Sequence, residues 1–265
     1  MHGTFTAMPK PKPRAKRPHR LALYEEAVQH PLAEVAFIEK VYAHYGGKSA
    51  YPLRLREDFA GSAAVSAAWV FSDPDREAMA VENHGPTIKY AQRVRGNLDG
   101  LHLVESDVMD FDRPQVDAVA SLNFSTFIWH TRKQLVAYFR QARRCLRPGG
   151  VFVMDAFGGP GAQRLETQRR EHDGFDYLWE QKAFNPVTAR IDCRIHFAWP
   201  DGQRLNNAFR YDWRLWGPAE LTEALSEAGF AAADVWADDG RGRYRPTAKM
   251  PAEENWVVYV VGHRG

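Results

Sequence analysis

The sequence of 265 residues lacks the features that place a chain in a membrane, and it contains only two cysteines. It has no run of 18 or more apolar residues, and no apolar segment follows the positive charges near the N-terminus, so we expect neither a membrane span nor a signal peptide. Cys145 and Cys193 have no metal-ligand spacing to each other or to histidine. We therefore expect reduced thiols in a cytoplasmic protein, and no zinc site.

Acidic side chains are missing from the first twenty residues. This segment holds six Lys and Arg residues and four prolines, whereas the whole chain has a net charge of only +2. The interleaved prolines oppose a helix and the composition cannot form a packed core, so we predict a disordered basic tail over 1–20. Three interpretations of this tail are open: a solvated extension, a mispredicted start of the protein, or an arm that binds nucleic acid or an acidic partner.

One stretch organises the rest of the chain, although it is poor in glycine. Residues 54–70 begin as a short strand, pass an acidic pair, cross a turn of small residues and continue into an Ala-rich helix. Small side chains around Gly61 leave backbone N–H groups at the helix N-terminus open to a ligand. A strand over 77–82 then ends in Glu82, about 20 residues on, where Rossmann-type folds place the carboxylate that binds a ribose. Tight helix–strand packing and a solvated strand end are the alternative explanations of Gly61 and Glu82.

The order of these elements resembles class I S-adenosylmethionine-dependent methyltransferases, whose first motif runs acid-x-Gly-x-Gly-x-Gly. Here residues 57–63 read EDFAGSA, so Phe59 and Ala63 stand at two of the three glycine positions. The wording LREDFAGSA resembles a bacterial subgroup with this variant of the motif. The resemblance extends over residues 52–157, through five elements in the family's order and an Arg-Pro-Gly-Gly turn before the fifth strand.

The fold is predicted to be α/β, and the family resemblance specifies its architecture. We expect a Rossmann-like, seven-stranded, mostly parallel sheet with flanking helices, plus a small inserted antiparallel sheet of three strands. Apolar residues that alternate with period two predict the inserted strands, and Asp201-Gly202 predicts a hairpin turn between two of them. The expected units after the tail are N-terminal helices at 21–47, a cofactor-binding core at 48–160, the inserted sheet at 161–216 and the C-terminal part of the core at 217–265.

The resemblance implies S-adenosylmethionine as the cofactor and S-adenosylhomocysteine as its product. Asp107 is expected to accept from the adenine amino group while the N–H of Val108 meets the ring, and a cap on the following turn is the other role for Asp107. Tyr24 is expected either near the methionine end of the cofactor or packed on the sheet. The predicted cofactor-binding residues are Tyr24, Glu57, Phe59, Ala60, Gly61, Glu82, Asn83, Asp107, Val108, Asn123 and Phe124.

Methyl transfer requires that the nucleophile be positioned and, where it starts protonated, that a base remove the proton. His130 lies just beyond the fourth strand and is a candidate base, because histidine titrates near neutral pH; its competing role is in the helix N-terminal turn. Tyr177 and Glu180 on the inserted sheet are the other candidates. They point to opposite faces of a strand, so at most one faces the pocket. The sequence does not separate N-, O- and S-methylation.

We predict an enzyme that methylates a small-molecule acceptor, because an inserted sheet that covers the pocket excludes a folded macromolecule. Homodimerisation is the other use we consider for this sheet. A nucleic-acid methyltransferase is supported by the basic tail and by Asn123-Phe124, but the Pro-Pro that follows Asn in base-modifying relatives is missing. A non-catalytic, methyltransferase-like binding subunit is the third interpretation, since the first motif is depleted in glycine. The missing Gly-x-Gly-x-x-Gly argues against a nicotinamide dehydrogenase.

Overall fold

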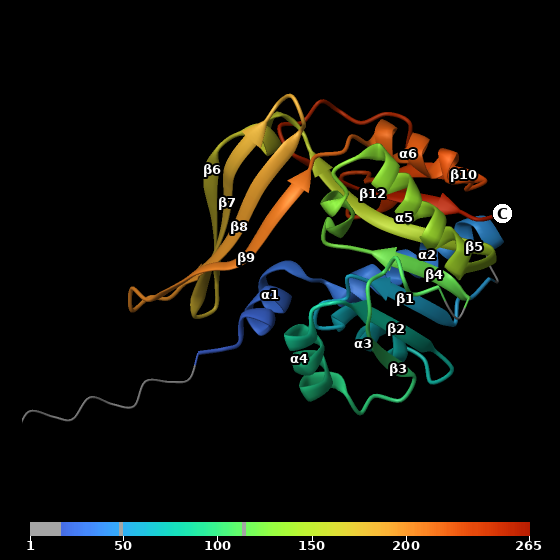
Figure 1. The fold of residues 1–265 in the computed structure, drawn as a ribbon, viewed down its shortest axis with the longest axis horizontal. Coiled ribbons are helices and arrows are strands. Elements are labelled where there is room, and N and C mark those ends of the chain that lie inside the picture. The colour runs from blue at the N-terminus through green and yellow to red at the C-terminus, as the bar shows by residue number, and fades with distance from the viewer. Residues whose placement is uncertain (1–16, 48–49, 113–114) are drawn as a thin grey trace, which may run out of the picture.

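The computed structural model describes residues 17–47, 50–112 and 115–265, in which a large sheet with helices lies beside a smaller sheet (Figure 1). Most of the predicted tail lies outside these ranges. The prediction of disorder was wrong for residues 17–20: Arg17 lies over the ring of Trp199, 4.7 Å from its centroid, and Arg20 begins the first helix. Two of the six tail cations therefore contribute to the folded part of the chain.

The large sheet has eight strands in the described residues, in the order β11-β10-β12-β5-β4-β1-β2-β3. The strands from β1 to β5 run parallel. Beyond β5, the strands β12, β10 and β11 follow in that order, and each is antiparallel to the strand before it. The bounds are β1 (Arg54–Asp58), β2 (Glu77–Glu82), β3 (Leu101–Glu105), β4 (Val116–Ser121), β5 (Leu146–Gly158), β10 (Ala232–Asp238), β11 (Tyr244–Pro246) and β12 (Trp256–His263). The predicted fold class is confirmed, but the sequence missed β11, because three residues ending in proline carry no readable period.

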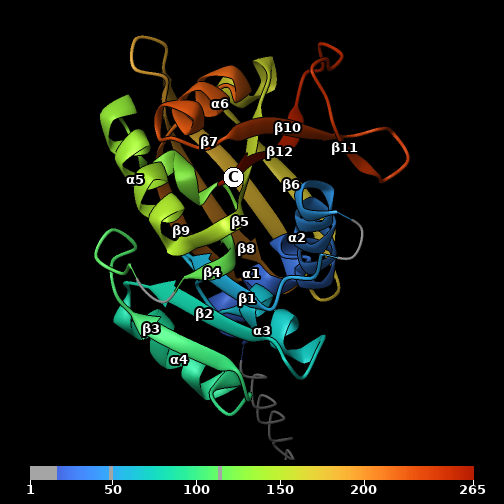
Figure 2. The same cartoon turned by 90° about the vertical axis from the view of Figure 1, so that its right-hand side faces the viewer.

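Helices cover both faces of this sheet. The helices of the described residues are α1 (Arg20–Val28), α2 (Pro31–Gly46), α3 (Ala64–Phe71), α4 (Gly85–Arg95), η1 (Ser125–Ile128), α5 (Arg132–Cys145), η2 (Pro160–Gln163) and α6 (Pro218–Glu227). Every residue of β4 is buried: Val119 packs in the cluster with α5 and α6, whereas Ala118 and Ala120 pack in the cluster with α2 and α3. Figure 2 shows these two helix layers on opposite sides of the sheet. β4 is thus the buried middle strand that its apolar sequence predicts.

Local signals set several helix ends as expected. Pro31 occupies the first position of α2, so the predicted break at His30-Pro31 separates α1 from α2. The side chains of Thr131 and Gln134 form the predicted capping box at the start of α5. None of the described helices is long and apolar enough to cross a membrane.

The small sheet, called the lid sheet below, has four antiparallel strands instead of the predicted three. Its strands are β6 (Glu166–His172), β7 (Phe175–Asn185), β8 (Arg190–Ala198) and β9 (Arg204–Arg214). The sequence missed β6 because its ETQRREH sequence lacks apolar alternation; it is an exposed edge strand held through the β7 ladder. The predicted turn at Asp201-Gly202 is present, with Gly202 at φ 83°. Leu23 and Ala27 of α1 pack on the apolar face of this sheet, against residues such as Phe197.

Candidate functional site

The turn between β1 and α3 keeps a glycine-type backbone although it contains a single glycine. Phe59, Gly61 and Ala63 have φ angles of 57°, 55° and 58°, in the left-handed region. These are the three positions where the family motif has glycine. A non-glycine residue held in such a conformation costs about 1–3 kcal/mol, and the surrounding structure must compensate. The space on the Cβ side of Gly61 is open, so the turn preserves the close approach that the motif provides.

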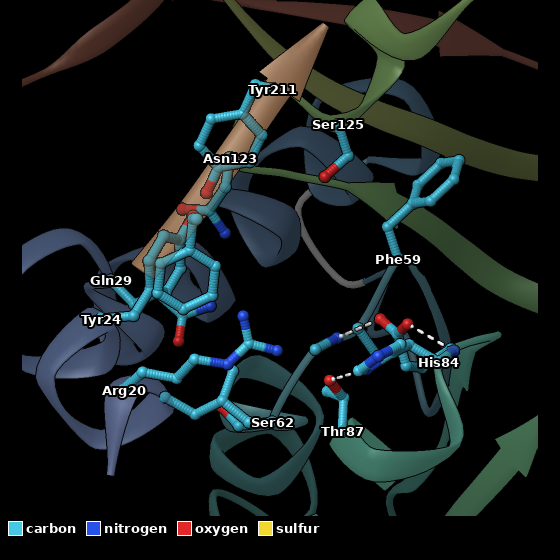
Figure 3. Close-up of a pocket in the computed structure, with 15 residues that line it drawn as sticks. Arg20, Tyr24, Gln29, Phe59, Ser62, His84, Thr87, Asn123, Ser125 and Tyr211 are labelled. Carbon is cyan, nitrogen blue, oxygen red and sulfur yellow. Dashed lines mark hydrogen bonds between the residues drawn. The ribbon is translucent and has the colours of Figure 1, made fainter. Parts of the chain in front are cut away.

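A cavity of about 300 Å³ opens against this turn; we call it the first cavity (Figure 3). It lies between the turn, the start of α4 and residues of α1 and the lid sheet. The residues predicted to bind cofactor that line it are Tyr24, Phe59, Ala60, Gly61, Glu82 and Asn123. The predicted residues that meet at this one site thus come from segments far apart in the sequence.

Glu82 is fixed at the edge of the first cavity by the backbone. Its Oε2 accepts from the N–H of Gly61 at 3.1 Å, and its Oε1 accepts from the N–H of His84 at 2.9 Å. Each carboxylate oxygen can accept more than one hydrogen bond, so both retain capacity for hydroxyl donors of a ligand. The carboxylate is thus oriented before any ligand arrives.

Arg20 and Gln29 also line the first cavity, and the sequence analysis missed both. Arg20 donates from Nη1 to the carbonyl of Ala208 at 2.8 Å and lies 5.0 Å from the ring centroid of Phe209. Gln29 is buried, and its Oε1 has no partner among the described residues. The cavity therefore offers a cation and an unsatisfied acceptor. Arg20 was hidden by its place in the basic tail, and no sequence signal marks Gln29.

Several predicted cofactor residues line neither this cavity nor the second one described below. Glu57 is buried, and its Oε2 accepts from the N–H and Oγ of Ser66 at 2.8 and 2.5 Å, while burial raises its pKa to about 7. Asn83 and Asp107 lie outside both cavities. Asp107 accepts from the N–H of Met109 at 2.8 Å, the turn-capping geometry that its sequence position also allows. Val108 is buried beside it.

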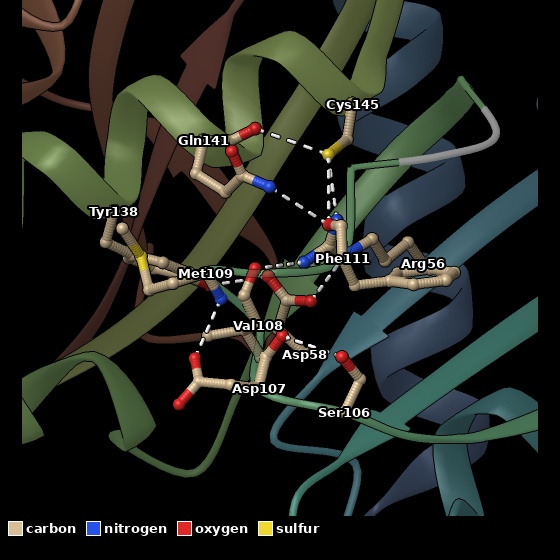
Figure 4. A network of polar contacts seen from close by, with 10 residues as sticks. All are labelled: Arg56, Asp58, Ser106, Asp107, Val108, Met109, Phe111, Tyr138, Gln141 and Cys145. Atoms are coloured by element: carbon tan, nitrogen blue, oxygen red, sulfur yellow. Dashed lines mark hydrogen bonds and ion pairs between the residues drawn. The ribbon is translucent and has the colours of Figure 1, made fainter.

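The loop that carries Asp107 and Val108 is tied to β1 by Arg56, a fully buried cation (Figure 4). Arg56 donates to the carbonyl oxygens of Val108, at 2.9 Å, and Phe111. It also pairs with Asp58 at 2.6 Å, and Tyr138 donates to the other Asp58 oxygen at 2.9 Å. Such a pair is stable only when the remaining polar atoms are satisfied, and this network satisfies them through the loop backbone.

A second cavity of about 480 Å³ lies between the lid sheet, α2 and β12, and Asn123 lines it as well as the first. Asp155 lies in its wall and accepts from the backbone N–H groups of Asn123 at 3.0 Å and Phe124 at 2.7 Å. Both of these residues are in the left-handed region, with φ of 57° and 60°. Asp155 therefore holds the turn after β4 in the shape that places Asn123 between the cavities, and Phe124 lines the second cavity alone.

Two carboxylates in the second cavity are shifted toward protonation. Burial, together with the neighbouring charges of Asp155 and Glu57, raises the pKa of Glu34 to about 8. Burial raises the pKa of Asp155 to about 7, against the opposing effect of its two backbone donors. Sequence analysis did not identify either group, because their surroundings arise from packing between distant segments.

Of the candidate bases, Tyr177 lines the second cavity, whereas His130 and Glu180 line neither the first nor the second. Burial raises its pKa to about 12, and the guanidinium of Arg170 lies 4.4 Å from its ring centroid. Glu180 instead contacts His196 at 3.1 Å. His130 lies 2.8 Å from the carbonyl oxygen of Asp212, which holds it against β9. The structure therefore brings neither Glu180 nor His130 to either cavity.

We predict that Arg56→Met lowers the free energy of unfolding by about 3–5 kcal/mol, because it leaves the Asp58 carboxylate buried without its cation. Denaturant unfolding measures the effect. The matched control is Arg54→Met on the same strand, whose exposed pair with Glu77 is worth less than about 1 kcal/mol. Equal losses for the two variants would contradict this account of the buried Arg56–Asp58 pair.

We also predict that stability falls as pH rises from about 5 to 8 and that Glu34→Gln reduces this slope. Between the ordinary pKa of 4.5 and the raised value near 8, folded Glu34 binds more protons than unfolded Glu34, so rising pH favours unfolding. Unfolding at pH 5 and pH 8 measures the slope, with Glu26→Gln, an exposed position, as control. An unchanged slope in Glu34→Gln would overturn the assignment.

Comparison with known proteins agrees with this arrangement. Residues 60–154 match the family model described as a methyltransferase domain. No curated protein matches the sequence. Among solved structures, the chain is similar to the CcbJ methyltransferase from Streptomyces caelestis, at 21% identity and a TM-score of 0.66, covering 89% of this chain and 97% of that one.

Two further structures match over nearly their whole length. The sugar N-methyltransferase KedS8 from Streptoalloteichus is 20% identical with a TM-score of 0.64, covering 99% of each chain. The amino pentose methyltransferase CalS10 from Micromonospora echinaspora, solved with S-adenosylmethionine bound, is 15% identical with a TM-score of 0.69, covering 96% of this chain and 100% of that one. Residues 60–154 are therefore similar to a methyltransferase domain, and the chain has the Rossmann-like fold of the S-adenosylmethionine-dependent methyltransferases that it matches.

Proposed function

We propose that this chain is an enzyme that transfers a methyl group from S-adenosylmethionine to a small-molecule acceptor. The observation that carries the proposal is the pair of cavities that share Asn123. One lies against the β1–α3 turn and Glu82, and the other lies beneath the lid sheet. A donor and an acceptor bound in the two cavities would meet at their shared wall.

The polar groups of the first cavity fit the parts of S-adenosylmethionine. Glu82 suits the ribose hydroxyls, because its oxygens are oriented and retain acceptor capacity. Arg20 suits the methionine carboxylate, since a guanidinium pairs with a carboxylate through charge-assisted hydrogen bonds. The unpartnered Oε1 of Gln29 suits the ammonium group. Asp107 and the N–H of Val108 remain the proposed adenine contacts, on the loop that Arg56 fixes.

S-adenosylmethionine supplies a methyl group made electrophilic by the sulfonium sulfur. The chain's own task is to align an acceptor atom with that methyl and to exclude water. Tyr24 from α1 and Tyr211 from the lid sheet line the first cavity together with the β1–α3 turn. Glu57 is proposed to act indirectly, since its bond to Ser66 holds the first turn of α3.

Three observations favour a small acceptor. The volume of the second cavity is within the range of small-molecule sites, about 300–1,000 Å³. The lid sheet contributes residues such as Tyr177 and Trp179 to its wall, so the sheet covers the acceptor side. The similar structures include a sugar N-methyltransferase and an amino pentose methyltransferase.

The retained left-handed backbone at Phe59 and Ala63 argues against a non-catalytic binding subunit.

We predict that Glu82→Ala weakens S-adenosylmethionine binding about 10- to 100-fold, because hydrogen bonds to a charged group contribute about 1.5–3 kcal/mol. Isothermal titration calorimetry measures this change, and release of S-adenosylhomocysteine with a panel of amines, phenols, thiols and sugars measures turnover.

The matched control is Glu105→Ala. Glu105 is the residue paired with Glu82 at the end of the next strand, and it is exposed and outside the first cavity. Unchanged cofactor affinity in Glu82→Ala would refute the assignment of the ribose site. An absence of turnover with every acceptor class, together with normal cofactor binding, would favour a binding subunit.

A further inference from the structure

Glu34 stands out among the groups of the second cavity. It is 9% exposed, and its Oε2 has no hydrogen-bond partner among the described residues. It lies in the first turn of α2 and lines the second cavity together with Asp155. Burying a carboxylate oxygen without a hydrogen-bond donor costs free energy. A ligand that places a donor beside Glu34 would remove this cost.

We propose that the second cavity holds its acceptor through an amine, which donates to the free oxygen of Glu34 within reach of Asp155. The proposal rests on the proposed function and names the acceptor class. An ammonium group carries only hydrogen-bond donors and a positive charge. The unpartnered oxygen of Glu34 needs a donor, and the carboxylates of Glu34 and Asp155 would stabilise the charge. Aromatic rings of Trp179, Trp256 and Tyr259 line the same cavity and suit a cation through their faces.

The other charged and titratable groups of the cavity wall are consistent with this assignment. Arg170 is the arginine that lines it, and its guanidinium lies over the ring of Tyr177. His30, next to the start of α2, and Tyr244 of β11 also belong to the titratable set. An anionic acceptor would keep Glu34 and Asp155 in their uncharged forms, whereas an ammonium is stabilised by their charged forms in this poorly solvated site. Arg170 and Gln168, both from β6, remain for hydroxyl or acidic groups elsewhere on the acceptor.

Methyl transfer to an amine forms one bond, breaks one bond and releases one proton. An ammonium must lose one proton before its nitrogen has a lone pair, and the Glu34 carboxylate to which it would donate can accept that proton. The N–C bond then forms as the S–C bond of the donor breaks. The products are a methylammonium, the thioether and the released proton.

The experiment compares benzylamine with benzyl alcohol, a cation and its neutral near-isostere, by calorimetry on the protein loaded with S-adenosylhomocysteine. We expect benzylamine to bind about tenfold more tightly or better. Burial raises the pKa of Glu34 to about 8, so amine binding at pH 7 should release protons, which titrations in buffers of different ionisation enthalpy detect. Glu34→Gln should abolish both the preference and the proton release, whereas Glu26→Gln should retain them.

The outcomes separate this inference from the proposed function. Binding of S-adenosylhomocysteine with equal binding, or no binding, of the two probes would overturn the amine site and leave the methyltransferase proposal intact. An amine preference that survives in Glu34→Gln would overturn the role of Glu34. Failure of S-adenosylhomocysteine to bind would count against the proposed function alone, because the probes can be titrated on the free protein. If Glu34→Gln does not fold, the wild-type comparison of the probes still decides.

Discussion

The site depends most directly on the carboxylate of Asp155, which lies in the wall of the second cavity. Its two oxygens accept from the consecutive N–H groups of Asn123 and Phe124, at 3.0 and 2.7 Å. Both residues hold left-handed backbone that a non-glycine residue adopts only when its surroundings enforce it. Without this carboxylate the turn after β4 would lose its fixed shape, and with it the residue that lines both cavities. The geometry of the candidate site and the local backbone strain are therefore linked at one point.

The first cavity has one wall from the large sheet and another wall from α1 and the lid sheet, which are additions to the core of the fold. The β1–α3 turn and Glu82 belong to the parallel sheet, whereas α1 and the lid sheet provide Tyr24 and Tyr211. Since α1 packs on the lid sheet through Leu23 and Ala27, these additions form one packed unit. The lid sheet also lines the second cavity, so we infer that this unit positions donor and acceptor together rather than separately.

Sequence reasoning succeeded where local pattern determines structure. The strand Glu77–Glu82 and the turn around Gly61 were predictable, because a period, a strand end and small residues each leave a local signal. Strand β6 was not predictable, since a polar edge strand pairs only through its backbone. Gln29, Glu34 and Asp155 were missed for another reason. Gln29 and Glu34 are buried and Asp155 lies in a cavity wall because distant segments pack around them, and their residue types are ordinary on a surface.

The measurement that tests the account most directly is calorimetric titration of the protein with S-adenosylmethionine and S-adenosylhomocysteine, with NAD as the control. We predict micromolar binding of both sulfur compounds and none of NAD. Absence of binding by both would mean that Phe59 and Ala63 close the first cavity despite its preserved backbone. That result would contradict the central claim that this turn binds the methyl donor.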